Sequence, residues 1–518
     1  METSAHSAYD VIIIGAGHNG LTAAALLAKQ GRKVLIVERR GIIGGLAAGE
    51  EFHPGYQSCG LLHDTGQLRA RVVRALDLQS YGLEISAQRP SVLALDLEGR
   101  GMLLGDKDRQ TAKEIGRYSP QDAGQYLKYR KFIKRVAGAL NRIFDEPPPS
   151  VESPDDRTFW RLLRTGFSLR RLGKTAMLEF MRISPMCVAD WLNEWFENNC
   201  LKAALAVAGL NGNFAAPWSP GTAFNLLLWE CSAKYSIKGG PRSLIAALKK
   251  AAQFHGVEIR TGCEVSNVQV SGGQVTGVVL ASGEYIHAPV VGASCDPRHA
   301  FLDLVPGNQV ENWQERRIRH IRGTGTTAKV NLALKTKLKF NGRSGEKIAF
   351  ARTGCHLDQI ERAFDTCKYG QFSAEPILDI HVPTVSTPDL APPGHSVVSI
   401  LVHFVPYGLQ PQWDQSQIEK LGNTVVAALE QYAPGVTEAI VAREVLSPVD
   451  LEARYGLVRG HIFHGEHALD QLILRPTPEC ARYHTPIKGL YLCGSGSHPG
   501  GGITCGPGAL AAAIIAKA

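Results

Sequence analysis

The stretch Tyr9–Arg40, YDVIIIGAGHNGLTAAALLAKQGRKVLIVERR, decides the fold of this chain. It opens with Val11–Ile14, a β-branched run that is typical of a strand buried on both faces of a parallel sheet. Residues 21–30 predict a helix whose amino-terminal N–H groups and positive dipole end would face a pyrophosphate. Residues 34–37 predict a second strand. The loop between the first strand and the helix carries three glycines in G-x-G-x-x-G spacing, which permits a tight turn and close backbone approach: Gly15, Gly17 and Gly20.

An acidic residue at the end of the second strand narrows the choice of nucleotide. Glu38 is placed to accept the ribose hydroxyls of an adenosine, and it would repel a 2′-phosphate. NAD and FAD share this pattern. The pair Gly44-Gly45 follows only six residues later, where a simple NAD dehydrogenase would continue with another βα unit. The second glycine turn therefore favours FAD, as in flavoproteins with two dinucleotide-binding domains.

Composition and length exclude several classes of protein. The chain has 518 residues, 44% of them apolar and 20% charged, so it is long enough for two or three soluble domains. Its net charge of +8 is modest, and no basic block with interleaved aromatic residues predicts nucleic-acid binding. No run of 18 apolar residues predicts a membrane-spanning helix. The few residues before the first strand are too short for a signal peptide, so we expect a cytoplasmic protein.

Cysteine and histidine usage adds two exclusions. The eleven cysteines are scattered singly, without a C-x-x-C pair, which predicts a reducing compartment and argues against a dithiol–disulfide reductase. The histidines show no metal-ligand spacing, so no metal site is predicted.

The pattern along the chain predicts an α/β fold with a discontinuous Rossmann-like FAD domain. We assign residues 1–90, 236–300 and 480–518 to this domain, because strand, glycine-turn and helix patterns occur in each. Residues 91–235 and 301–479 form an inserted α+β substrate domain of mixed sheet and helices. Within it, residues 120–182 read as helical.

The end of the chain carries a family resemblance. The segments GLYLCGSGSHPGGGITCGPGALAAAIIAKA (489–518), GHIFHGEHALDQLILRP (460–476) and GGPRSLIAALKKAAQFHGVEIRTGCEVSNVQVSGGQVTGVVLASGE (239–284) resemble the bacterial-type phytoene desaturase family of FAD-dependent oxidoreductases. The second segment resembles in particular the branch of pyridine nucleotide-disulfide oxidoreductase domain-containing protein 2. The resemblance is vague over residues 90–230. Cys505 departs from the glycine that this branch usually carries after its glycine loop.

The resemblance implies roles for individual residues. The first loop, with its glycines and with His18 and Asn19, would cradle the pyrophosphate, and Glu38 with Arg39 would hold the ribose. Val265 would begin the strand that faces the adenine. The residues implied on the flavin side are Gly44, Gly45, Leu46, Gly494, Ser495, Gly502, Ile503 and Gly508.

Candidate catalytic groups are few. His498, beside the final glycine loop, is the best ionisable candidate near the flavin, and its alternative role is to fix that loop by hydrogen bonds. His461 and His464 are further candidates, or simply loop histidines. Cys493 and Cys505 are expected to be buried apolar thiols. The segment 323–328 half-mimics a second dinucleotide turn but precedes a strand, so no NAD(P) site is predicted.

The run Arg157–Arg182 is basic and amphipathic. At helical spacing its apolar face is flanked by cations, the pattern of a helix lying on a membrane surface. The alternative is a buried amphipathic helix with a solvated basic side. A membrane contact would suit a lipid substrate.

Taken with the resemblance, these features predict an FAD-dependent oxidoreductase. Its expected reaction transfers hydride from an apolar, isoprenoid or lipid-like substrate to flavin N5, with reoxidation by oxygen or a quinone. Two alternatives stay open: a flavin amine oxidase, and a flavin-bearing binding or assembly protein with little turnover.

Overall fold

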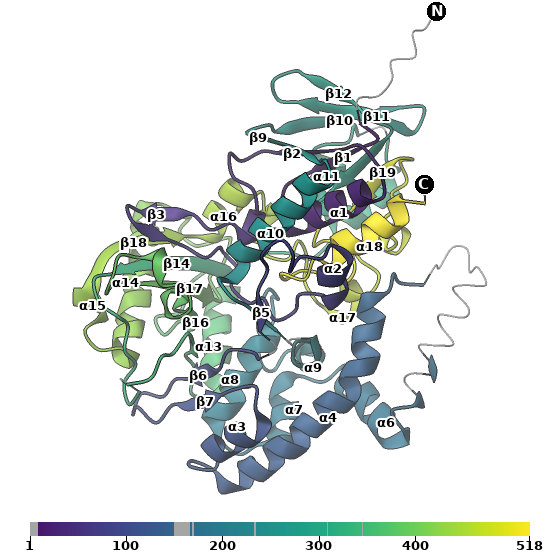
Figure 1. Ribbon diagram of the computed structural model, residues 1–518. Coiled ribbons are helices and arrows are strands. Elements are labelled where there is room, and N and C mark those ends of the chain that lie inside the picture. The colour runs from purple at the N-terminus through teal and green to yellow at the C-terminus, as the bar shows by residue number, and fades with distance from the viewer. Residues whose placement is uncertain are drawn as a thin grey trace, which may run out of the picture.

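A computed structural model of the chain describes residues 9–86, 88–149, 166–167, 170–232, 235–307, 309–343 and 345–517. A parallel sheet lies at the top of the molecule in Figure 1, a seven-stranded sheet lies below it, and a group of helices forms the base. The α/β fold predicted from the sequence is confirmed by this architecture.

The parallel sheet contains the first and the last strand of the described chain, β1 and β19. Its strand order is β19-β13-β1-β2-β9, and all pairs are parallel. Alternate residues of β1 face opposite cores, so that Ile13 packs toward α1 while Ile12 packs toward the small sheet β10-β11-β12. This double burial is why the strand is β-branched and apolar throughout. The strands are β1 Val11–Ile14, β2 Val34–Glu38, β9 Glu258–Thr261, β13 Val290–Ala293, β19 Leu490–Leu492, β10 Val265–Ser271, β11 Gln274–Leu280 and β12 Tyr285–His287.

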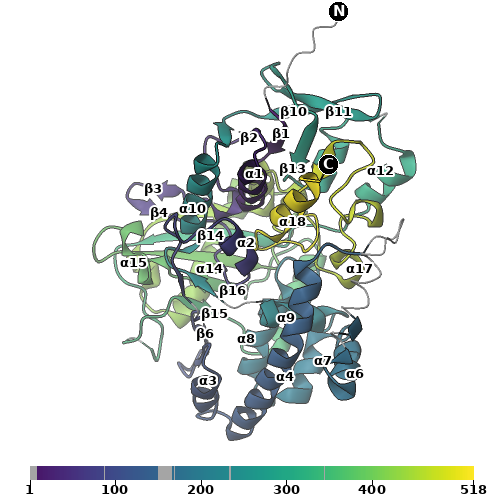
Figure 2. The same ribbon diagram turned by 45° about the vertical axis from the view of Figure 1, so that its right-hand side comes forward.

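Three helices cover one face of the parallel sheet. They are α1 His18–Lys29, α10 Gly240–Phe254 and α18 Gly506–Ile515. Figures 1 and 2 show α1 between the other two, although α18 is the last helix of the chain. The first helix begins at His18, three residues before the predicted start, and Gly20 lies in its first turn. The cap of α18 is Cys505, at φ +57°.

The seven-stranded sheet has one apolar and one polar face. Its order is β18-β14-β17-β16-β15-β6-β7, antiparallel except between β15 and β6. Val330, Ile400 and Ile380 pack with α14 Gln415–Tyr432 in an apolar core. The strands are β6 Val92–Ala94, β7 Met102–Leu104, β14 Thr327–Leu334, β15 Phe350–Arg352, β16 Ile377–His381, β17 Ser396–His403 and β18 Ile440–Leu446.

Helices from the middle of the chain form the base of the molecule (Figure 2). The longest is α4, whose start follows the predicted signal: Pro120 is its first residue and the Ser119 hydroxyl accepts the Asp122 N–H at 3.3 Å. These helices are α3 Asp108–Ile115, α4 Pro120–Asp145, α6 Lys174–Ile183, α7 Val188–Trp195, α8 Asn199–Leu210 and α9 Thr222–Ser232.

Short elements complete the described chain. They are η1 Gly45–Ala47, β3 Glu51–His53, β4 Tyr56–Gln57, α2 Ala70–Ala75, β5 Ile85–Ser86, β8 Ser236–Ile237, α11 Pro297–Leu302, α12 Asn312–Arg319, α13 Leu357–Lys368, η2 Pro383–Val385, η3 Pro388–Leu390, α15 Val436–Ala439, α16 Pro448–Tyr455, η4 Val458–Gly460, α17 Leu469–Leu472 and η5 Pro478–Cys480.

The basic amphipathic run is only partly described. Residues 157–165 and 168–169 lie outside the described residues. Most of the remainder forms α6, which buries Ala176 and Ile183 and exposes Leu178 and Met181. Across the part of the chain that the structure describes, no helix is long and apolar enough to span a bilayer.

Candidate dinucleotide site and adjoining cavity

The first glycine loop is shaped by close backbone contacts. A Cβ on Gly20 would lie 2.0 Å from the Gly15 carbonyl oxygen, so only glycine lets α1 start this close to β1. Gly17, the N-cap of α1, is different: a Cβ there would meet no atom within 4 Å. The backbone is therefore bare at the amino end of α1, where a phosphate would approach the free N–H groups. This open cradle fits the pyrophosphate of a dinucleotide.

The Glu38 carboxylate closes one side of this loop. Its two oxygens accept the N–H groups of Ala16 at 2.8 Å and Arg40 at 2.9 Å, and the residue is buried. Each oxygen keeps a further lone pair, which suits the two ribose hydroxyls. The Glu38 carbonyl accepts the Cys263 N–H at 2.9 Å, and this contact brings the start of β10 at Val265 to the same place.

Arg39 is turned away from this site. Its guanidinium donates to the carbonyls of Ala453 and Arg454, each at 3.2 Å. The side chain therefore ties β2 to α16, and a ribose contact from Arg39 would come only from its backbone.

The second glycine pair lies directly on the first loop. The Gly44 N–H donates to the Ala16 carbonyl at 2.9 Å, and Gly44 forms a bridge with Gly17. Gly44 has φ +117°, a conformation that favours glycine. The carbonyl of Leu46 accepts the Leu61 N–H at 2.9 Å. These contacts carry the chain along the site as far as Leu62 and His63.

The final loop packs against the same turn from the other side. The Asn19 Nδ2 donates to the Ser495 hydroxyl at 3.2 Å, and a Cβ on Gly508 would lie 2.1 Å from the Asn19 carbonyl. Gly508 therefore lets α18 approach α1. Gly494 serves a similar purpose, since its Cβ would lie 2.3 Å from the Ser294 carbonyl.

Two buried polar atoms in this junction lack a partner among the described residues: Asn19 Oδ1 and His18 Nε2. Burial lowers the pKa of His18 to about 4, so its imidazole is neutral. Unpaired buried polar atoms are costly, and a bound polar ligand would satisfy them. Gly502, at φ +93°, and the buried Ile503 complete the loop. The residues present therefore fit a dinucleotide.

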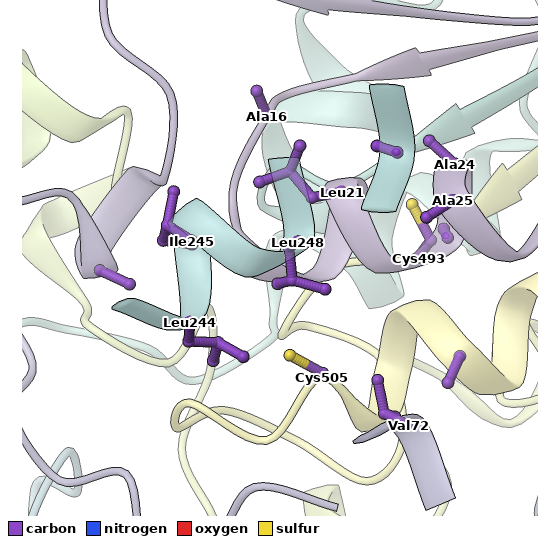
Figure 3. Close-up of a cluster of buried hydrophobic side chains, with 14 of the residues drawn as sticks. Ala16, Leu21, Ala24, Ala25, Val72, Leu244, Ile245, Leu248, Cys493 and Cys505 are labelled. Atoms are coloured by element: carbon purple, nitrogen blue, oxygen red, sulfur yellow. The ribbon is translucent and has the colours of Figure 1, made fainter. Parts of the chain in front are cut away.

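The thiols predicted to be buried are buried. Figure 3 shows Cys493 and Cys505 among apolar side chains that include Leu21, Leu244 and Leu248. Burial raises the pKa of Cys505 to about 12 and raises that of Cys493 further. Both therefore stay protonated and serve packing. The structure describes all eleven cysteines, and no disulfide joins any two of them.

The histidines singled out in the sequence differ in their hydrogen bonds, and neither ring nitrogen of His498 has a partner among the described residues. His498 is fully buried, its ring stacks on Phe144 at 5.6 Å, and it is not among the residues that line the cavity described next. Burial lowers its pKa to about 4. His461 Nδ1 accepts the N–H groups of Phe463 and Gly465 at 3.2 and 3.1 Å. His464 is buried nearby, and burial lowers its pKa. A catalytic role for His498 stays a prediction.

A cavity of about 450 Å³ adjoins both glycine loops. Leu62 and His63 line it from the loop that follows Gly44 and Gly45, and residues 502–504 line it from the final loop. From there the cavity extends between the polar face of the seven-stranded sheet and helices α8 and α9. Its size suits a small organic ligand.

The polar wall of this cavity was not predicted. Cross-strand register aligns Arg352, Asp379, Leu401 and Lys329 in one row across β15, β16, β17 and β14. Lys329 is almost fully buried, and its Nζ donates to the Leu61 carbonyl at 2.9 Å. Burial lowers the pKa of Lys329 to about 8. The signal in the sequence was alternation, because Lys329 and Asn331 face one side of an otherwise apolar strand.

Two further histidines face the cavity. His63 and His381 have ring centroids 5.0 Å apart, and His381 stacks on Phe350 at 4.3 Å. The Cys59 sulfur lies 3.3 Å from His381 Nδ1. Burial, with smaller effects from Lys329, holds the pKa of both imidazoles well below its usual value. Both are therefore neutral at physiological pH.

Comparison with known proteins agrees with this geometry. Residues 20–516 match the family described as flavin containing amine oxidoreductase. Pyridine nucleotide-disulfide oxidoreductase domain-containing protein 2 of Rattus norvegicus is 33% identical, over 98% of this chain and 93% of its own. The neurosporene-forming phytoene desaturase of Cereibacter sphaeroides is 24% identical, over 98% and 93%. An oxidoreductase structure from Methanosarcina mazei superposes with a TM-score of 0.61 at 16% identity, covering 98% of this chain and all of that one.

Proposed function

Because this chain belongs to the flavin containing amine oxidoreductase family and is an FAD-dependent oxidoreductase, we propose that it oxidises a carbon–hydrogen bond of a largely apolar small molecule. The cofactor and the resemblance to the phytoene desaturases, both predicted from the sequence, are confirmed. The finer statement, an isoprenoid or lipid-like substrate, is our proposal.

We assign FAD to the two glycine loops and the junction between α1 and α18. The first loop and the α1 amino terminus would hold the pyrophosphate, and Glu38 would hold the adenosine ribose. Residues 44–46 and the final loop would hold the flavin side. In this proposal residues 1–90, 236–300 and 480–518 form the FAD-binding part, and the other segments form the substrate part.

The main support for the proposal is the cavity beside these loops. Its walls near residues 502–504 include the apolar side chains of Leu62, Leu205, Phe463 and Ile503, which exclude water from the reacting carbon. Bound FAD supplies the hydride acceptor, and oxygen or a quinone would reoxidise it. The protein's part is to hold the substrate and keep the site dry.

Desaturation also releases a proton from the neighbouring carbon, and a base must accept it. His63 lines the cavity, its imidazole is neutral, and its Nδ1 is buried without a partner among the described residues. We assign His63 Nδ1 as the acceptor of this proton. His381, beside it, keeps the ring in place.

Charge pairing in the cavity argues against an amine substrate. Glu230 is paired with Arg130 at 2.5 Å, and Asp379 lies 3.3 Å from Arg352. Asp64 accepts the Trp229 Nε1 hydrogen at 3.0 Å. Two of these three carboxylates are paired with arginines, and Asp64 is the one that a cationic amine could meet without displacing an ion pair. Together with the apolar lining, this pairing favours the desaturase-like interpretation over an amine oxidase. A cavity of this size next to the cofactor loops likewise favours turnover over a binding or assembly role.

Anaerobic stopped-flow absorbance of the FAD-loaded protein tests the proposal. Terpenoid and long-chain aliphatic compounds should bleach the flavin, whereas primary amines of matched length should not. His63→Gln should slow the bleaching, and His320→Gln, at the exposed end of α12, should leave it unchanged. Bleaching by amines alone would replace this proposal with an amine oxidase.

A further inference from the structure

Two arginine guanidinium groups lie over the indole ring of Trp229, on α9. The Cζ of Arg352 lies 5.6 Å from the indole centroid and that of Arg89 lies 5.4 Å from it. All three residues line the cavity. Arg352 comes from β15 and Arg89 from the segment before β6, so the fold gathers two cations from distant parts of the sequence onto one ring.

These guanidinium groups have donors to spare. Arg352 is 9% exposed, its two Nη atoms make only long bonds of 3.3 Å to Asp379 and the Ala204 carbonyl, and its buried Nε has no partner among the described residues. The nearest carboxylates to Arg89 lie at 3.5 Å (Asp106) and 3.8 Å (Glu230), which is long for a hydrogen bond. A guanidinium carries five N–H donors. Much of this capacity is unused in the wall of the cavity.

The charges of the polar wall do not cancel. Arg352 and Lys329 occupy the same cross-strand row as Asp379, the one acid in that row. Lys329 is not among the residues that line the cavity, but it keeps its proton at neutral pH and donates to a carbonyl, not to a carboxylate. Glu230 is held by Arg130 at the neighbouring wall. A buried row with an excess cation is stabilised by an anion from outside the protein.

We propose that this end of the cavity binds the carboxylate of the substrate, through Arg352 and Arg89, while the apolar body of the substrate extends toward the final glycine loop. A planar carboxylate matches the guanidinium fork. The path to that loop is short: Ser232, one turn along α9 from Trp229, accepts from Gln67 at 3.2 Å, and Gln67 contacts Gly502. The inference rests on the proposed function and narrows the substrate class to apolar carboxylic acids.

Titration of the FAD-loaded protein with three probes of equal length tests this inference. The probes are decanoate, decanol and decylamine, and the readout is the perturbation of the flavin absorbance spectrum. Decanoate should bind at least about tenfold more tightly than decanol. Arg352→Met should remove this preference and leave the affinity for decanol unchanged. Arg319→Met, on the exposed α12, is the matched control and should retain it.

Two further variants guard against a folding defect. Arg352→Met combined with Asp379→Asn removes both members of the pair and leaves no buried unpaired acid. Arg89→Met changes a side chain without a close ion pair. Either variant should lose the preference for decanoate.

The inference is overturned if decanoate leaves the spectrum unchanged, if it binds no more tightly than decanol, or if these variants weaken both probes equally. None of these results refutes the proposed function, because the oxidation of neutral apolar compounds is tested separately. Reduction of the flavin by decylamine alone would instead refute the proposed function itself.

Discussion

Replacement of Lys329 by methionine should stabilise the protein at neutral pH. Lys329 is fully buried, and burial lowers its pKa from the ordinary value of 10.5 to about 8, despite the opposing effects of Cys59, Asp379 and Glu444. Because the folded-state pKa is the lower one, the unfolded chain binds more protons between these two values. The free energy of unfolding therefore rises with pH across that window, and below it the whole penalty of burying the ammonium is present.

The magnitude follows from the shift. A difference of this size corresponds to about 3 kcal/mol at about pH 7, and to roughly half of that at about pH 9.5. Methionine has a similar shape but cannot donate to the Leu61 carbonyl, and this loss costs about 1 kcal/mol. Lys329→Met should therefore raise the free energy of unfolding by about 2 kcal/mol at neutral pH. At about pH 9.5 the increase should be less than about 1 kcal/mol.

Urea unfolding of the wild type and the variant, at both pH values and with the same saturating FAD, measures this difference. Titrating groups far from Lys329 contribute equally to both proteins and cancel in the comparison. The imidazoles of His63 and His381, whose pKa Lys329 helps to lower, are neutral at both pH values. A difference that does not change with pH would show that Lys329 keeps an ordinary pKa. A variant less stable than the wild type at neutral pH would show that the ammonium is stabilised by its surroundings, and would refute the reasoning.

Three other changes have expected outcomes. Gly17→Ala adds a methyl group to open space, so it should weaken FAD binding by at least about tenfold without lowering the stability of the FAD-free protein. Gly124→Ala in α4, which also meets no neighbour, should leave FAD binding unchanged and stabilise the protein by about 0.5–1 kcal/mol through its better helix propensity. Glu38→Gln leaves one of its two backbone N–H partners without an acceptor, so stability should fall by about 1–3 kcal/mol and FAD should bind more weakly; unchanged urea midpoints would contradict this. Flotation with anionic vesicles at low salt should recover the protein, and the exposed α6 pair Leu178→Ser with Met181→Ser should reduce that recovery; equal recovery with neutral vesicles would indicate that this basic segment does not bind membranes.

The cofactor-binding half of the protein follows from the sequence itself. Gly15 and Gly20 specify a turn that needs glycine at these two positions, and Gly17 leaves the backbone open to a ligand. The flanking strand and helix are local structures of their own residues. Glu38 is the last residue of the strand that follows, so its distance along the chain fixes its place beside the loop. Short-range backbone geometry therefore determined the fold class and the cofactor.

The substrate side was decided by tertiary structure. Arg352, Asp379 and Lys329 meet only because β15, β16, β17 and β14 pair in one register, and nothing local marks these residues as neighbours. Trp229 joins them from a helix across the cavity. His498 shows the converse, since it lies beside the glycine loop in sequence yet packs on Phe144. Long-range strand pairing and helix packing, which one-dimensional patterns do not encode residue by residue, placed the charged groups in the cavity.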